Sequence, residues 1–251
     1  MMGTSGVAGM GPSLGWAARG LSALFWGLPL ALLACVKTAL GDGWRAFGSW
    51  GAPAVRGAGW PGLLLDTLQA CLPAGAAVWL LLHGLRLLGR FQRQERVWAA
   101  AVDRAKVMGG LVLALVPFAH WWSLRPTEPL FMESMVLLVF GGIALMLSLN
   151  RVLLRLAAML PDVVLRSDTA LFSRVNACLI GLLAALMALE AFAMRRPGTL
   201  PAYLEALLME LGESRNWLFV MLALVPLALT MTLLWKAKES IHERVFSDPH
   251  G

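Results

Sequence analysis

The sequence predicts an all-α integral membrane protein, a polytopic transmembrane helical bundle of about six spans with short amphipathic interfacial helices. Two observations predict this class. Of 251 residues, 59% are hydrophobic and 14% are charged, whereas an ordinary soluble domain is about 45–50% apolar and about 25% charged. Long apolar runs also recur along the chain, which indicates a single integral membrane domain over residues 1–251.

Each apolar run must supply about 20 residues, because a helix rises about 1.5 Å per residue and the hydrocarbon core is about 30 Å thick. Six runs do so, over residues 14–36, 63–88, 107–124, 131–153, 177–194 and 217–235, and a short cytoplasmic tail is expected at 236–251. Lipid offers no hydrogen-bond partner to an open backbone, and the sequence lacks the alternating pattern of a membrane barrel. The six runs are therefore expected to be helices.

The distribution of basic residues predicts the orientation. The N-terminal segment, the second and fourth connections and the tail together carry twice as many lysines and arginines as the other three connections. Positive charge resists translocation, so both termini are predicted to be cytoplasmic. Tryptophans, which prefer the headgroup zone, gather at the opposite boundary: Trp44, Trp50, Trp60, Trp121, Trp122 and Trp217. The abundance of Arg, Ala, Gly and Leu is typical of a GC-rich bacterial genome, which indicates a bacterial inner (cytoplasmic) membrane.

The formal charge of +6 fits cytoplasmic loops that face anionic lipid. The basic residues flank apolar spans and form no contiguous patch with interleaved aromatic residues, so nucleic acid is not expected as a partner. The expected partners are the lipid bilayer and, if the chain is a subunit, other membrane proteins.

Three connections show helical patterns. Residues 91–106 and 161–176 mix apolar side chains with arginines, which predicts amphipathic elbows at the cytoplasmic interface. Leucines at helical spacing in 200–211 predict a short helix on the outer surface, and Thr199 and Pro201 mark its start. Residues 41–62 are rich in Gly, Trp and Pro and are expected to form an irregular loop.

The three cysteines, Cys35, Cys71 and Cys178, lie inside apolar segments without the spacing of a metal site. Residues 32–35 resemble a lipoprotein cleavage box. The stretch before them is long and glycine-rich and carries only Arg19, unlike the basic start of a signal peptide. We therefore expect an uncleaved first span, with a lipidated Cys35 as the alternative.

The sequence contains no motif that predicts a catalytic residue, a cofactor or a metal site. His242-Glu243 begins like a zinc-protease motif, but Phe246 stands where the second histidine ligand is needed. Walker, dinucleotide-binding and nucleophile-elbow patterns are missing from the sequence. His83 and His120 lie in neighbouring spans at opposite depths, roughly 20 Å apart by helical rise, which is too far for one haem iron.

Carboxylates inside spans are the costliest polar residues of the sequence. Glu190 is the deepest, roughly 6–9 Å inside the outer boundary by helical rise. Asp66 and Glu133 begin their spans at that boundary, and His120 ends its span there. The four residues are candidates for a binding or ion site in the outer half of the membrane, with His120 as the first choice of partner for Glu190. The alternative is that Asp66 and Glu133 only begin helices, where the dipole favours them.

Small residues predict where helices approach closely. Ala177, Gly181 and Ala185 repeat every fourth position in the fifth span, and Gly141-Gly142 lie in the fourth. Prolines interrupt four spans, at Pro29, Pro73, Pro117 and Pro226. Such prolines bend helices and are also the places where transporters hinge.

Three functions fit these features. The sequence favours a non-enzymatic accessory, structural or regulatory membrane subunit. The first alternative is a small ion-coupled transporter whose site includes Glu190. The second is a membrane-embedded enzyme that acts on a lipid-linked substrate.

Overall fold

The computed structural model describes residues 10–40, 59–92, 94–125, 127–160, 162–195 and 214–246, together with 201, 203, 204, 206 and 210. Six long helices make up most of this part of the chain. They are α1 (Met10–Leu40), α2 (Gly59–Leu88), α3 (Arg96–Leu124), α4 (Pro129–Met159), α5 (Val163–Arg195) and α7 (Ser214–Phe246). All six are long and apolar enough to cross a bilayer, so the chain is a multi-pass membrane protein, as the sequence predicts.

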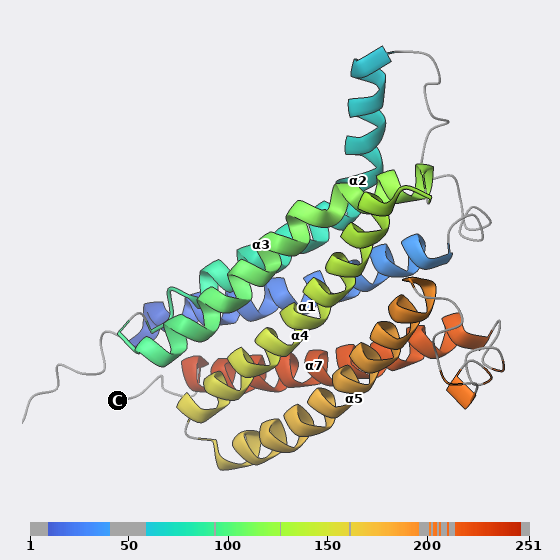
Figure 1. Ribbon diagram of the computed structural model, residues 1–251. Helices are drawn as coiled ribbons and strands as arrows, with labels where there is room; N and C mark the ends of the chain where they lie inside the picture. Colours follow the sequence, from blue (N-terminus) through green and yellow to red (C-terminus); the bar gives the residue numbers. More distant parts are fainter. Residues whose placement is uncertain are drawn as a thin grey trace, which may run out of the picture.

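The helices form a tilted bundle in which each packs against its neighbours in the order α1, α2, α3, α4, α5, α7, and α7 closes the ring on α1 (Figure 1). Only a few residues connect α2 to α3, α3 to α4 and α4 to α5, so the helices of each pair run antiparallel. The side chains buried most completely gather toward the predicted cytoplasmic end of the bundle. They are Leu21, Leu24, Leu28, Leu85, Leu88, Trp98, Leu156, Leu233, Leu234 and Ile241.

The helices extend beyond the predicted spans at the predicted cytoplasmic end, and this corrects the expected elbows. Residues 96–106 are the first turns of α3, and residues 163–176 are the first turns of α5, rather than separate interfacial helices. The predicted tail likewise continues α7 as far as Phe246. Polar residues in these stretches do not end the helices, because an α-helix satisfies its own backbone hydrogen bonds whatever its side chains face.

Two other predictions fall largely outside the described residues. The loop predicted at 41–62 lies there, except that residues 59–62 belong to α2. For the outer helix predicted at 200–211, Tyr203, Leu204, Ala206 and Glu210 are helical, and the Leu204 N–H donates to the Pro201 carbonyl at 2.9 Å.

The first part of α2 bends away from the bundle (Figure 1). Pro73 lies inside the helix and removes a backbone donor, which accounts for the bend. Leu64, Leu68 and Leu72 in this part are more than three-fifths exposed, as expected for side chains that face lipid. The bent part stays tied to α3, because the Trp121 indole N–H donates to the Thr67 hydroxyl at 3.2 Å.

Close helix approach occurs, but at glycines that the sequence did not single out. A Cβ added to Gly20 of α1 would lie 2.9 Å from the carbonyl oxygen of Gly84 in α2, and a Cβ on Gly84 would lie 2.9 Å from the carbonyl oxygen of Gly20. A Cβ added to Gly141 would lie 3.4 Å from Val112 of α3, an ordinary contact, and a Cβ added to Gly142 would meet nothing within 4 Å, so the close approach predicted for the fourth span is wrong within this chain. The close approach predicted for the fifth span is also wrong within this chain, because a Cβ added to Gly181 would meet no atom within 4 Å.

Candidate functional site

Glu190 is buried inside the bundle. It lies in the last two turns of α5, and only 8% of its surface is exposed. The same residue is the deepest carboxylate predicted from the sequence. A carboxylate held in such surroundings is stable only when a proton, a cation or hydrogen-bond donors compensate its charge.

The other three predicted site residues are placed differently. Glu133 of α4 is exposed and pairs with Arg195 of α5 at 3.7 Å, so it forms a surface ion pair across two helices. His120 is partly buried on α3, and α4 lies between α3 and α5 in the ring. The side chain of Asp66 lies outside the described residues. A pairing of His120 with Glu190 stays a prediction.

The described residues show no group of three or more His, Cys, Asp and Glu side chains that could hold a metal ion. The inner face of α5 instead carries uncharged polar side chains. Thr169, Ser173 and Asn176 are all at least 95% buried, and they follow one another at helical spacing. We call Thr169, Ser173 and Asn176 the polar face of α5. Glu190 lies on the same side of the helix, about 21 Å farther along, and the apolar residues Ile180, Leu183 and Met187 lie between it and Asn176.

Hydrogen bonds tie this face to both neighbouring helices. The Asn150 amide of α4 donates from Nδ2 to the carbonyl oxygen of Ser173 at 3.0 Å. The Asn176 amide donates from Nδ2 to the Thr230 hydroxyl of α7 at 2.9 Å, and that hydroxyl donates to the Pro226 carbonyl at 2.7 Å. Inside a membrane bundle, such bonds hold helices together.

The partners of the two asparagines fix the orientation of their amides. The Ser173 carbonyl can only accept a hydrogen bond, and the Thr230 hydroxyl has already given its hydrogen to Pro226, so both asparagines must present their NH₂ groups. Their Oδ1 atoms are left as buried acceptors, and neither has a hydrogen-bond partner in the described part of the chain. The interior between α4, α5 and α7 therefore presents oxygen acceptors, which suit a cation or a proton donor.

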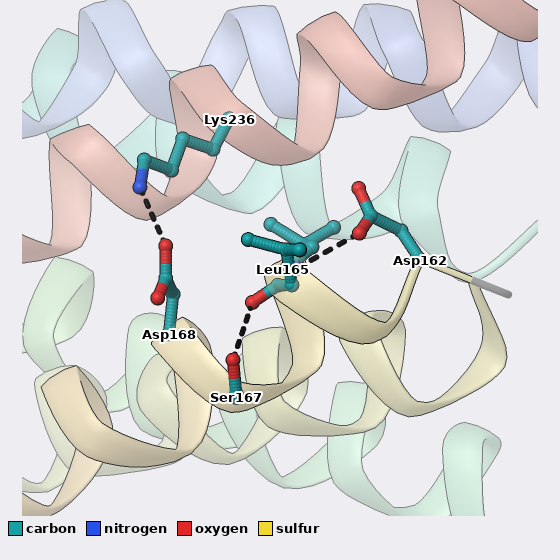
Figure 2. A network of polar contacts seen from close by, with 6 residues as sticks. Asp162, Leu165, Ser167, Asp168 and Lys236 are labelled. Carbon is teal, nitrogen blue, oxygen red and sulfur yellow. Dashed lines mark hydrogen bonds and ion pairs between the residues drawn. The ribbon is translucent and has the colours of Figure 1, made fainter.

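Charged residues mark the opposite end of this interface (Figure 2). The Lys236 ammonium of α7 contacts the Asp168 carboxylate of α5 at 2.7 Å and lies 5.8 Å from the centre of the Phe172 ring. Asp162 begins α5, where one carboxylate oxygen accepts the Leu165 N–H at 3.0 Å. The other oxygen of Asp162 lies 3.5 Å from the Ser240 hydroxyl of α7, so α5 and α7 are joined twice near this end.

Sequence reasoning missed Asn150, Asn176 and Thr230. Thr169, Ser173 and Asn176 were assigned to an interfacial elbow, where polar residues are ordinary. Their spacing of four and three residues is a helical signal that could have placed them on one face of a span.

Comparisons with known proteins add no family. No protein-family model matches the chain, and no curated protein or solved structure matches it.

Proposed function

We propose that this multi-pass membrane protein is a small ion-coupled carrier in which Glu190 binds and releases the coupling ion. One observation carries the proposal: Glu190 is a carboxylate within the apolar part of α5, and only 8% of it is exposed. A carboxylate inside a membrane span is costly, which makes it a candidate for a functional site.

Other buried oxygen atoms support this reading. The amide oxygens of Asn150 and Asn176 are oriented as acceptors, and Glu190 adds a carboxylate about 21 Å farther along α5. A proton or a monovalent cation is the class of ligand that such oxygens take. His120, Asp66 and Glu133 are proposed as helpers at the outer end, and Glu133 is the weakest of them because it pairs with Arg195 at the surface.

The remaining features of the proposal concern location. We infer a bacterial cytoplasmic membrane with both termini in the cytoplasm, from the excess of basic residues on that side. In this orientation Glu190 lies in the outer half of the bilayer, and the Asp168–Lys236 pair lies toward the cytoplasm.

The experiment is ion flux into vesicles that contain the purified protein. A membrane potential, negative inside, is imposed, and internal pH and internal sodium are followed with entrapped dyes. We expect uptake of one of the two ions above that of empty vesicles, and its loss in Glu190→Gln, which keeps the shape and removes the charge. Glu239→Gln is the matched control, because it removes an exposed carboxylate of α7 that has no place in the proposed site. Wild-type uptake no faster than that of empty vesicles, or Glu190→Gln uptake equal to wild type, overturns the proposal.

A second candidate is an accessory subunit, and one observation favours it. The small residues of α5 are exposed on the outside of the bundle: Ala177, Gly181 and Ala185. A Cβ added to Gly181 would meet no atom within 4 Å. Stripes of this kind allow close packing of a helix from another chain. Purification from native membranes in mild detergent distinguishes the two functions. A subunit copurifies with other proteins at a fixed stoichiometry, whereas a carrier of this kind is purified alone or as a homo-oligomer.

A further inference from the structure

Two guanidinium groups, one from α1 and one from the turn after α2, lie near one indole ring at the end of the bundle. The Arg19 Cζ atom lies 5.6 Å from the centre of the Trp16 ring, and the Arg90 Cζ atom lies 4.9 Å from the same centre. Trp16 and Arg19 belong to the beginning of α1, and Arg90 follows the end of α2. The two positive charges can therefore be no more than about 10.5 Å apart, the sum of these distances.

The surrounding contacts hold this arrangement in place. The Gly20–Gly84 approach brings α1 and α2 together one turn away, and Leu88 is fully buried against Gly20. Phe91, next to Arg90, is buried and packs edge-on against Trp98 of α3 at 6.1 Å. The turn that carries Arg90 is thus anchored on both sides.

Within the described residues, no carboxylate forms an ion pair with either arginine of this cluster. Arg19 and Arg90 are both exposed. Like charges held this close repel one another, so an anion between them stabilises the arrangement.

The position of the cluster identifies the anion. The first candidate span begins at Leu14 and the second ends at Leu88, so Trp16 and Arg90 lie where the bundle leaves the hydrocarbon. Indole rings prefer this headgroup zone, and basic residues there bind anionic lipid. Arginine is suited to phosphate, because its planar fork donates two hydrogen bonds to phosphate oxygens while its face stacks on an aromatic ring.

From these contacts we infer that Arg19, Trp16 and Arg90 form a binding site for the phosphate of an anionic phospholipid headgroup. This site is independent of Glu190 and of the proposed transport function. The occupant is a lipid rather than free phosphate because Trp16 and Arg90 lie at the ends of the first two candidate spans, at the membrane boundary where headgroup phosphate is concentrated.

The test uses the full-length protein in nanodiscs of phosphatidylcholine with increasing phosphatidylglycerol, and native mass spectrometry of the bound lipid. We expect the double variant Arg19→Gln/Arg90→Gln to bind phosphatidylglycerol about 100-fold more weakly than wild type, because each guanidinium loses a charge-assisted hydrogen bond to phosphate. The matched control is Arg104→Gln/Arg174→Gln, which removes the same charge from two exposed arginines elsewhere. An equal loss in both double variants indicates general surface attraction and overturns the site.

Two further measurements complete the test. Inorganic phosphate added to protein in pure phosphatidylcholine should leave the apparent melting temperature unchanged; a rise equal to that given by phosphatidylglycerol overturns the lipid as occupant. Should the double variant fail to fold, Arg90→Lys replaces it, since it keeps the charge and loses the planar fork. We expect this variant to bind phosphatidylglycerol several-fold more weakly, and binding equal to wild type contradicts the site.

Discussion

The contact between Gly20 and Gly84 gives the sharpest prediction about the fold. Gly20→Ala places a methyl group 2.9 Å from the Gly84 carbonyl oxygen and 2.9 Å from Leu88 Cγ, whereas ordinary contact begins at 3.4 Å. A backbone carbonyl cannot rotate away, so α1 and α2 must separate by roughly 0.5 Å along the contact. A gap of about 0.5–1 Å forfeits a quarter to a half of a van der Waals contact.

We therefore expect Gly20→Ala to destabilise the bundle by about 1–3 kcal/mol, the usual range for overpacking. Gly15→Ala is the matched control in the same helix, because a Cβ there meets nothing within 4 Å. The assay is unfolding of the purified protein by a denaturing detergent, followed by tryptophan fluorescence. Equal stability of Gly20→Ala and Gly15→Ala would refute the close approach of α1 and α2.

Three further predictions test other parts of the structure. The ion pair between Lys236 and Asp168 is partly exposed, so Lys236→Met should destabilise the bundle by only about 1 kcal/mol or less, and a double-mutant cycle with Asp168→Asn should assign that loss to the pair. Cysteines placed at Arg96 and Arg166 should resist a membrane-impermeant thiol reagent added to intact cells; labelling of either one reverses the predicted orientation. The intact mass of the purified protein should include the segment before Cys35, and a mass that starts at a lipidated Cys35 would show that the first span is cleaved.

The sequence predicted the number and position of the helices well, because span length depends on local composition alone. Each predicted span lies inside one helix of the structure, for example 14–36 in α1 and 131–153 in α4. The elbow at 161–176 was misinterpreted for a physical reason: composition shows that a residue is polar, but not whether it faces water or another helix. Asn176 faces Thr230, which is 54 positions away in the sequence.

The candidate site was predictable only in part. Burial of Glu190 was predictable from its depth in an apolar run, because a carboxylate that faces lipid is costly. The contacts of Asn176 with α7 and of Asn150 with α5 were not predictable, because they depend on how each helix is rotated about its axis. Helix packing depends on the same rotation, which is why the stripe of Ala177, Gly181 and Ala185 was expected inside the bundle and lies outside it.

Covalent labelling of Glu190 tests the central claim most directly. Hydrophobic carbodiimides react with protonated carboxyl groups in apolar surroundings, and peptide mass spectrometry locates the adduct. If Glu190 binds and releases a proton or a cation, it should be labelled in native membranes, and labelling should fall as pH rises or as the coupling cation is added. Labelling at Glu190 that is absent, or that stays constant across pH and cation concentration, would contradict the proposed carrier function.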